Sequence, residues 1–397
     1  MEGYLPRITE ERIARALAQF PIVVIEGPRG VGKTTTASLF AKSIVRLPQD
    51  LGNLRADPEG FLALLEPPIL IDEWQLAGTD FLWILKNLVD ADPTSGRFIL
   101  TGSVEPASYG PTYPLTGRSV RVTIFPMMAS EIAGNGSGPQ FLSRFLDAPP
   151  AVTAGEIGTF DVTKLFTTGF PAARALPDAA MFLESYAATV SQRAGDEGRD
   201  STRFYRTAQV LATLEAQAVP DQRIWEAADI NKATWKKYQD LLARTWLAAP
   251  IPAFSSNRLA RITEYPKRFL VDTALSLALA QVSEDELLRD PMLLGRYLES
   301  YVAAQLRPQT ASLRAELYHL RTSGGAHEID FIVDAPKGVL AFEVKAATSV
   351  TASDAKHLLW LRENLGERFL KGAVLYTGAD VRPIAGNIWA IPISLLD

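Results

Sequence analysis

A glycine-rich loop directly follows a short β-branched run near the start of the chain, and this order constrains the fold more than any other feature. Residues 22–25 read IVVI and predict a buried strand. Residues 27–34 read GPRGVGKT, a full match to GxxxxGK followed by Ser or Thr, and residues 35–43 have the apolar spacing of a helix. Strand, glycine loop and helix in this order are typical of a phosphate-binding site. We therefore expect an α/β domain built on a parallel sheet.

The loop predicts ATP and Mg2+ as cofactors, because each of its parts has a role toward them. Its amides surround phosphate oxygens, Lys33 reaches the β- and γ-phosphates, and the Thr34 hydroxyl binds magnesium. The predicted nucleotide-binding residues are those of the loop together with two polar residues at the end of a later strand. They are Gly27, Pro28, Arg29, Gly30, Val31, Gly32, Lys33, Thr34, Thr35, Thr101 and Ser103.

Two carboxylates end the next apolar run of the sequence. Residues 69–71 predict a strand, and Asp72 and Glu73 follow it directly. We expect Asp72 to hold the magnesium ion and Glu73 to polarise the water that attacks the γ-phosphate. The alternative is that the two residues only begin a turn.

Two later segments add candidates for the same site. Residues 97–103 predict a strand whose end carries Thr101 and Ser103, which either sense the γ-phosphate or cap the turn. Arg118 precedes another strand-like run at residues 120–125. It is a candidate for stabilising transition-state charge, within one chain or across a subunit boundary. A surface salt bridge is an equally weighted alternative for Arg118.

The segments GPRGVGKT, ILIDEWQ, ILTGS and LTGR occur in this order, and together they resemble a family of bacterial and archaeal AAA+-like ATPases. Members of that family join an N-terminal ATP-binding domain to a C-terminal domain of unknown function, number 4143. The resemblance covers nearly the whole chain and implies that the last domain is related to the PD-(D/E)XK nucleases. Because AAA+-like ATPases often act as rings, an oligomer is among the expectations. The Gly-Phe-Pro element at residues 169–171 also resembles the family, but Ala172 replaces its usual Glu, so this element receives no catalytic role.

The length of 397 residues predicts two or three domains, and the motifs favour three. Glycine and proline cluster between residues 134 and 150, which indicates a linker or a long loop. We expect an AAA+-like P-loop ATP-binding domain at 1–145, a helical region with a winged helix-turn-helix at 146–285, and a nuclease-like α/β domain at 286–397.

The predicted helix-turn-helix carries a local excess of basic residues. Residues 224–228 and 232–242 predict its two helices, with Asn231 as the N-cap of the second. The segment 231–268 holds eight basic and two acidic residues, which leaves +6 in a chain of net charge −5. Contacts from this segment to phosphates predict DNA or RNA as a partner. The alternative is a solvated basic face on a module that packs between domains or binds a protein.

Four residues of the C-terminal part resemble the arrangement of PD-(D/E)XK nucleases. Glu299 lies on the border of the apolar stripe of a predicted helix, Asp330 lies in a strand-like run, and Glu343 and Lys345 share one face of the next run. The resemblance implies that all four are catalytic and that Asp330 and Glu343 bind a divalent metal ion. An isoleucine precedes Asp330 where the superfamily has proline, so the motif is incomplete.

The composition excludes several other classes of site. The chain has no cysteine, which excludes disulfides, thiolate zinc sites, iron–sulfur clusters and cysteine nucleophiles, and its three histidines show no metal-ligand spacing. No apolar run approaches the roughly 18 residues of a membrane span, and the N-terminus lacks the apolar region of a signal peptide. We therefore expect a cytoplasmic protein with no membrane contact.

The leading functional expectation is Mg-dependent ATP binding and hydrolysis, coupled to a nuclease-like module that acts on nucleic acid or is regulated by it. The alternative is a nucleotide-gated regulatory or partner-binding switch whose nuclease-like domain is a catalytically inactive scaffold. A small-molecule kinase is disfavoured, because Asp72 and Glu73 suit water activation and no arginine cluster typical of a lid follows them.

Overall fold

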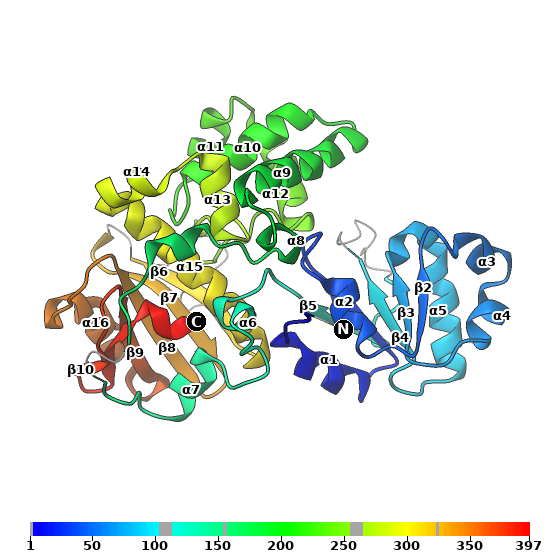
Figure 1. Ribbon diagram of the computed structural model, residues 1–397, viewed down its shortest axis with the longest axis horizontal. Coiled ribbons are helices and arrows are strands. Elements are labelled where there is room, and N and C mark those ends of the chain that lie inside the picture. The colour runs from blue at the N-terminus through cyan, green and yellow to red at the C-terminus, as the bar shows by residue number, and fades with distance from the viewer. Residues whose placement is uncertain (1–2, 103–112, 154–156, 255–264, 323–324) are drawn as a thin grey trace.

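The computed structural model describes residues 3–102, 113–153, 157–254, 265–322 and 325–397, and these form two sheets and a helical region. Figure 1 shows the N-terminal sheet at one end of the molecule, the C-terminal sheet at the other, and the helical region above and between them. This arrangement confirms the expected α/β class. None of the helices in the described parts of the chain is long and apolar enough to cross a bilayer.

The N-terminal sheet is parallel, with the strand order β2–β3–β4–β1–β5. Alternation along β1 sends Val23 and Ile25 into one core and Ile22 and Val24 into another, so both faces of the sheet are covered. The strands are β1 (Ile22–Glu26), β2 (Ser43–Arg46), β3 (Ile69–Asp72), β4 (Phe98–Thr101) and β5 (Ser119–Thr123). The helices of this part are α1 (Thr9–Leu17), α2 (Lys33–Ser38), α3 (Leu51–Ala56), α4 (Pro58–Ala63), α5 (Asp80–Ala91) and α6 (Ala129–Ile132), with the 3-10 turn η1 (Trp74–Ala77).

Helix α2 is shorter than the sequence predicts. It ends at Ser38, whereas the apolar spacing indicates a helix that continues to residue 43. The backbone amides of Lys42 and Ser43 instead bond to the carbonyl of Pro68, which starts β2 alongside β3. Pairing with an existing strand therefore outweighs the helix propensity of this segment.

The helical region shares a hydrophobic core with one face of the N-terminal sheet. Val23 and Leu70 of the sheet belong to the same buried cluster as Phe204 and Trp235. The region contains η2 (Val162–Phe166), α8 (Pro171–Arg174), α9 (Ala179–Asp196), α10 (Ser201–Thr213), α11 (Asp221–Ala227), α12 (Lys232–Arg244), α13 (Thr273–Ala280) and α14 (Glu284–Arg289). The P-loop domain and the helical region are thus held together by packing.

Helices α11 and α12 lie where the sequence predicts a helix-turn-helix pair. The side chain of Asn231 accepts a hydrogen bond of 2.8 Å from the amide of Thr234, which confirms Asn231 as the N-cap of α12. The expected wing falls partly on residues 255–264, which lie outside the described residues.

The C-terminal sheet is mixed, with the order β10–β11–β9–β8–β7–β6, and the long helix α15 (Pro291–Ser312) packs on it. Its strands are β6 (Glu316–Arg321), β7 (Glu328–Ala335), β8 (Gly338–Lys345), β9 (Phe369–Tyr376), β10 (Arg382–Ala385) and β11 (Ile388–Pro392). The 3-10 turns η5 (Ala352–Ala355), η6 (Gly366–Arg368) and η7 (Ile393–Leu396) and the helix α16 (Lys356–Leu365) complete this part.

The stretch that the sequence predicts as a linker contains a helix, α7 (Phe141–Asp147), which packs on the C-terminal sheet. The ring centroid of Phe141 lies 5.9 Å from that of Phe342 on β8. The linker interpretation of residues 134–150 is therefore wrong for this part. Glycine and proline flank the helix, but its apolar residues Phe141, Leu142 and Phe145 decide its placement.

Candidate functional site

The glycine-rich loop lies at the carboxyl end of β1 and leads into α2, as the sequence predicts. The structure places residues 27–35 together in this loop and the first turn of the helix. Gly27 has a φ of 143°, and a Cβ there would come within 2.1 Å of the carbonyl oxygen of Ile124. Gly32 has a φ of 93° and caps α2 in the left-handed region. Both positions require glycine, and together they determine the backbone conformation of the loop and therefore the direction of its amides.

Lys33 is buried in the loop, and no carboxylate of the described residues is in direct contact with it. Its Nζ donates hydrogen bonds to the carbonyls of Gly27 at 2.9 Å and Pro28 at 2.7 Å. Burial lowers the pKa of Lys33 to about 8, although Glu73 and Asp72 oppose that shift. The loop carbonyls thus hold an ammonium group that is available to phosphate oxygens at the same loop.

Asp72 joins three elements at the carboxyl edge of the sheet. Its Oδ1 accepts a hydrogen bond of 2.7 Å from the hydroxyl of Thr34 and one of 2.6 Å from the hydroxyl of Thr101. Carboxylate and hydroxyl oxygens are the ligands that Mg2+ prefers. The donor set therefore fits a magnesium ion beside the loop. Ser103, the other strand-end candidate, lies outside the described residues.

Glu73 adopts a backbone conformation that is rare for a residue with a side chain. Its φ of 55° and ψ of 43° lie in the left-handed region, directly before η1. Its carboxylate accepts a hydrogen bond from the side-chain amide of Gln75, and its negative charge favours the charged form of Lys33. Strained conformations of this kind cluster at functional sites. Glu73 lies in the turn that joins β3 to η1, as the alternative interpretation states, and its charge also acts on Lys33 of the loop.

A cavity of about 450 Å³ adjoins the phosphate-binding loop at the start of α2. Thr35 and Thr36 of α2 form one side of it, Tyr4 and Arg7 of the N-terminal segment another, and Arg174 of α8 a third. The volume lies in the range of small-molecule pockets. Sequence reasoning missed the residues outside the loop, because no motif at their positions points to this cavity.

A buried ion pair connects the N-terminal segment to the loop and to the segment after β5. Arg7 donates to the carbonyls of Val31 at 2.8 Å and Phe125 at 2.7 Å, and its Nε lies 3.1 Å from Glu131. Glu131 also accepts hydrogen bonds from the amides of Ile8 and Met128. The pair is almost fully enclosed and fixes three segments around the loop.

The helical region contributes an arginine near the loop that sequence reasoning did not identify. Arg193 of α9 and Arg29 of the loop line the same small cavity, together with Tyr186. Burial and the charge of Arg29 lower the pKa of Arg193, and Glu73 opposes that shift. Two guanidinium groups that repel each other beside Glu73 form a site where an anion is favourable.

Arg118 lies at the opposite edge of the sheet from the loop. It precedes Ser119, which pairs with Ile22 at the amino end of β1, so a full strand of about 16 Å separates it from the loop. Its Nη2 donates to Asp90 at 3.0 Å. The expected role within its own chain is therefore wrong, and the surface salt bridge is what the structure shows. A role across a subunit boundary stays a prediction.

The structure brings together the four residues predicted for the C-terminal domain. Glu299 comes from α15, Asp330 from β7, and Glu343 and Lys345 from β8, where Lys345 Nζ lies 3.5 Å from Glu343 Oε2. A fifth residue, Lys267, enters this centre from the segment before α13. Its Nζ lies 2.5 Å from Glu299 Oε2 and 2.9 Å from Asp330 Oδ1.

Burial and mutual charge set the protonation of this centre. Burial raises the pKa of Glu299 to about 8, and the neighbouring Asp330 adds to that shift. Burial would lower the pKa of Lys267, but the two carboxylates together raise it above its ordinary value. Lys267 in turn holds the pKa of Asp330 below its ordinary value against the effect of burial. The ammonium thus supplies the counter-charge of the centre.

The centre as it stands does not fit a metal ion. Among the residues that the structure describes, no group of three or more His, Asp or Glu is arranged to hold one. Lys267 lies between the carboxylates of Glu299 and Asp330, where a divalent ion would need them. We therefore derive no metal-dependent step from this centre.

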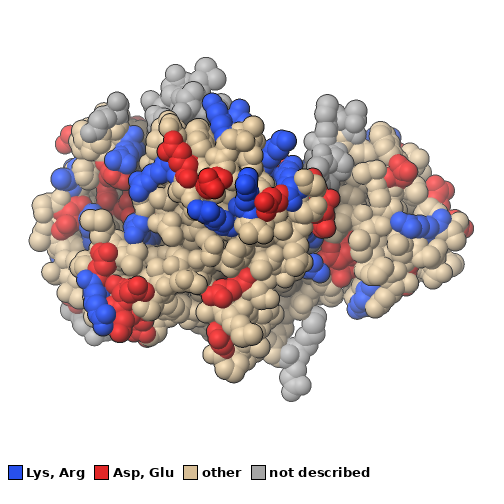
Figure 2. Space-filling view, turned by 90° about the horizontal axis from the view of Figure 1, so that it is seen from above, with Lys and Arg blue, Asp and Glu red and all other residues tan. Residues whose placement is uncertain are grey.

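The basic segment is less basic at the surface than its sequence indicates. Lys267 and Arg268 are buried, and Arg268 forms an ion pair with Asp221. Arg244 pairs with Glu197 and Asp240. These three side chains therefore add little to an exposed basic surface, and Arg258 and Arg261 lie outside the described residues. The exposed basic residues of the described part of the segment are Lys232, Lys236 and Lys237 on α12. On the face shown in Figure 2, basic and acidic side chains alternate over the helical region.

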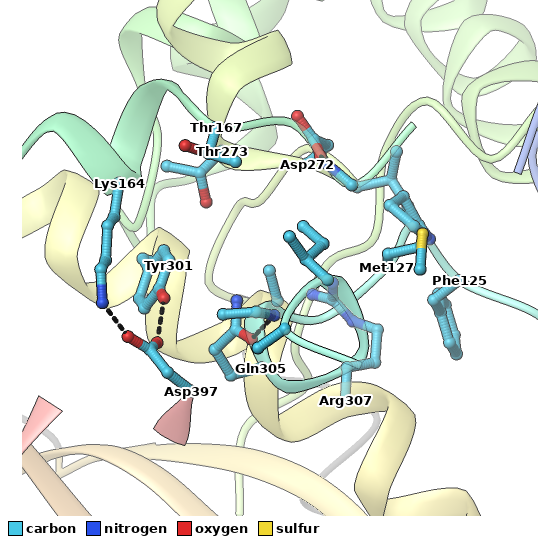
Figure 3. Close-up of a pocket in the computed structure, with 17 residues that line it drawn as sticks. Phe125, Met127, Lys164, Thr167, Asp272, Thr273, Tyr301, Gln305, Arg307 and Asp397 are labelled. Atoms are coloured by element: carbon cyan, nitrogen blue, oxygen red, sulfur yellow. Dashed lines mark hydrogen bonds and ion pairs between the residues drawn. The ribbon is translucent and has the colours of Figure 1, made fainter. Parts of the chain in front are cut away.

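A further cavity, of about 280 Å³, lies where the segment after β5, the start of α13 and α15 meet (Figure 3). Phe125, Asp272, Tyr301 and Arg307 line it, and the hydroxyl of Tyr301 donates to Asp397. None of the described residues that the sequence predicts for the two sites lines this cavity. It marks the place where the chain leaving the P-loop domain touches the helix that carries Glu299.

The fold and the first site define a class of domain: the N-terminal part is a P-loop domain, with a parallel sheet, a phosphate-binding loop and an acidic strand end. Residues 19–133 match the family described as AAA domain. Residues 294–396 match the Domain of unknown function (DUF4143), and residues 163–286 match the Domain of unknown function (DUF8612). The chain therefore contains one part similar to the AAA domain and a later part similar to DUF4143.

Similar proteins of comparable length occur in mycobacteria. Uncharacterized proteins of Mycobacterium tuberculosis (strain ATCC 25618 / H37Rv) and Mycobacterium bovis (strain ATCC BAA-935 / AF2122/97) are each 26% identical over 395 residues, covering 96% of this chain and 82% of each relative. Among solved structures, a Walker-type ATPase of Pyrococcus abyssi is similar with a TM-score of 0.38 and 14% identity, over 68% of this chain and 94% of that chain. A signal transduction ATPase with numerous domains from Pyrococcus horikoshii has a TM-score of 0.27 and 14% identity, over 79% of this chain and 50% of that chain.

Proposed function

We propose that this protein binds ATP with Mg2+ at the loop of residues 27–34 and hydrolyses it. The observation that carries the proposal is the hydrogen bond of 2.7 Å between Thr34 and Asp72, which puts a hydroxyl and a carboxylate beside the buried ammonium of Lys33. These are the groups that a nucleoside triphosphate with a divalent ion requires. The match of residues 19–133 to the AAA domain supports the same function.

In this proposal each residue has a defined task. Lys33 moves from the loop carbonyls to the β- and γ-phosphate oxygens, and its positive charge offsets theirs. Thr34 and Asp72 hold the magnesium ion, which when bound neutralises the phosphate charge. Glu73 orients the attacking water and accepts its proton. Arg193 of the helical region stabilises the γ-phosphate charge and so makes the helical region responsive to the nucleotide.

The proposed binding site is tested by titrating a fluorescent ATP analogue in the presence of Mg2+. Lys33→Ala removes the buried ammonium and should weaken binding on the order of 100-fold. Lys42→Ala is the matched control, because Lys42 lies just beyond α2 but is exposed and pairs with the exposed Glu66. If Lys33→Ala bound the analogue as tightly as Lys42→Ala does, the nucleotide would not lie at this loop.

The second candidate function is a nucleotide-gated switch in which the C-terminal domain is an inactive scaffold. The placement of the Lys267 ammonium between Glu299 and Asp330 favours it. Incubation of DNA and RNA with the wild-type protein and Mg2+ or Mn2+ distinguishes an inactive scaffold from an active nuclease. The scaffold predicts no cleavage with or without ATP. Cleavage that is lost in Lys345→Ala would instead support an active nuclease.

We place the proposed nucleic-acid binding at three exposed lysines of α12, Lys232, Lys236 and Lys237. Each phosphate contact contributes about 0.9 to the slope of log affinity against log salt, so the three lysines predict a slope of about 3. The double variant Lys236→Glu/Lys237→Glu should abolish this binding to DNA and RNA alike. Unchanged binding in that variant would exclude α12 as the contact surface.

A further inference from the structure

The cavity drawn in Figure 3, of about 280 Å³, has walls from all three parts of the chain. Phe125 and Met127 come from the segment that follows β5, Thr167 and Thr273 from the helical region, and Tyr301 from α15. Apolar and aromatic side chains make up much of this lining. The volume lies just below the range that is usual for drug-sized ligands, so an occupant of this cavity must be smaller than they are.

Arg307 of α15 brings an unpaired positive charge to the cavity. Its guanidinium lies 5.9 Å from the ring centroid of Phe125, and its Nη2 donates a hydrogen bond of 2.7 Å to the carbonyl of Ala249. Among the described residues, no carboxylate lies within ion-pair distance of Arg307. Burial lowers the pKa of Arg307 to about 10, and the charge of Glu215 opposes that shift. Arg307 therefore stays charged at neutral pH and, with five N–H donors, can bind a further anion.

Two carboxylates of the lining are already satisfied by the chain itself. Asp397 forms an ion pair with Lys164, which Figure 3 shows as a dashed line. Asp272 accepts hydrogen bonds of 2.8 Å from the amide of Gly169 and of 2.9 Å from an amide in the first turn of α13. Neither carboxylate is therefore free to neutralise Arg307.

The cavity lies at a contact between the P-loop domain and the C-terminal part. The side chain of Gln305, two residues before Arg307 on α15, accepts a hydrogen bond of 2.8 Å from the amide of Ala129 in the segment after β5. Phe125 begins that segment, and its carbonyl accepts from Arg7, which also bonds to the phosphate-binding loop. A molecule between Arg307 and Phe125 would thus touch both sides of this contact.

We propose that this cavity binds a small organic monocarboxylate, with the carboxylate on Arg307 and the apolar body against Phe125 and Met127. A guanidinium matches a carboxylate in both charge and planar geometry. The apolar walls favour a ligand with a hydrocarbon or aromatic body over a bare inorganic anion. Because the ligand joins α15 to the segment after β5, its binding stabilises the folded chain as its concentration rises.

The test uses benzoate as the probe, because it combines a carboxylate with an apolar ring. Benzamide is the matched control ligand, since it has nearly the same shape but no charge. Calorimetry measures the binding of each to the full chain without nucleotide, so the outcome does not depend on the proposed ATPase function. We expect one benzoate to bind per wild-type chain, and benzamide to bind on the order of 10-fold to 100-fold more weakly.

Two variants place the probe in this cavity. Arg307→Met should weaken benzoate binding by a similar factor, whereas Arg289→Met, at an exposed arginine of α14, should bind benzoate as wild type does. Ala304→Leu keeps the test decisive if Arg307→Met fails to fold, because it fills the cavity from a partly exposed position of α15 and leaves Arg307 in place. This variant should lose benzoate binding.

Urea unfolding gives an independent measure of the same binding. Benzoate should raise the urea midpoint of wild type and of Arg289→Met, but not that of Ala304→Leu. The proposal would be overturned if wild type showed no saturable binding of benzoate, or if it bound benzamide as tightly as benzoate. Equal benzoate affinity in wild type and Ala304→Leu would overturn it as well.

Discussion

The hydroxyl of Thr34 donates a hydrogen bond of 2.7 Å to Oδ1 of Asp72, although the two residues are 38 positions apart in the chain. Thr34 is the second residue of α2, behind the glycine loop, and Asp72 ends β3, the second strand away from β1. Parallel strands deliver both to the same edge of the sheet. This contact turns two separate sequence motifs into one site, and the first prediction follows from it.

Asp72→Asn should reduce Mg-dependent ATP turnover by about two orders of magnitude, because an amide cannot neutralise the charge of a magnesium ion. Since the amide oxygen can still accept from Thr34 and Thr101, the sheet edge should keep its structure. The measurement is steady-state turnover over a range of Mg2+ concentrations. Asp50→Asn, at a partly exposed carboxylate after β2, is the control and should behave as wild type. Turnover in Asp72→Asn equal to the control would remove Asp72 from the site.

Arg193→Met should lower turnover at least tenfold while changing ATP affinity much less, because its charge acts where negative charge grows in the transition state. Arg203→Met is the matched control, since Arg203 lies in the same helical region but is exposed and pairs with Asp200. Turnover and affinity are measured on the same preparations. A parallel loss of both quantities would show that Arg193 only helps to bind the nucleotide.

Arg7→Met should destabilise the folded chain by about 3 to 5 kcal/mol, because it leaves the buried carboxylate of Glu131 without its counter-charge. The control Arg15→Met removes an exposed pair with Glu11 and should change stability by less than about 1 kcal/mol. Urea unfolding gives both values. A small effect for Arg7→Met would mean that Glu131 is satisfied by the amides of Ile8 and Met128 alone.

The stability of the protein should depend on pH through Glu215. Burial raises the pKa of this carboxyl group from 4.5 to about 7, against the hydrogen bonds from Ser300 and Ser276. The folded state therefore retains a proton that the unfolded chain releases between about pH 4.5 and pH 7. The contribution of Glu215 to stability falls as the pH rises through this window, by roughly 3 kcal/mol in total, and changes no further above it.

Glu215→Gln should remove this dependence, so that the variant is more stable than wild type at pH 8 but not at pH 4.5. Urea unfolding at a series of pH values measures the difference between the two curves. Glu184→Gln, at an exposed position, is the control and should keep the wild-type profile. Identical pH profiles for wild type and Glu215→Gln would show that Glu215 does not titrate in this window.

Much of the first site was predictable from local sequence. The β-branched run before Gly27 and the apolar run before Asp72 predict their strands, because a buried parallel strand needs such residues on both faces. Edge strand β2 was not predicted, since its four residues contain only two apolar ones and its place depends on pairing with β3. Helix α7 was not predicted for the same reason, since its position depends on contacts with Phe342.

The residues that sequence reasoning misplaced depend on long-range contacts. Lys267 and Arg268 read as part of a basic surface, because local charge does not reveal that Glu299, Asp330 and Asp221 meet them. Arg7 and Arg193 carry no motif at all, and only the fold brings them to the loop. A sequence gives the chemistry of each side chain, whereas burial and partner decide its role.

The measurement that tests the central proposal most directly is the rate of phosphate release from ATP by wild type and by Glu73→Gln, each with Mg2+ and with a chelator. We expect wild type to release phosphate only with Mg2+. Glu73→Gln should bind ATP normally and release phosphate at least 100-fold more slowly, since an amide cannot accept the proton of the attacking water. Equal rates in the two proteins, or a wild-type rate that persists in the chelator, would contradict hydrolysis at this site.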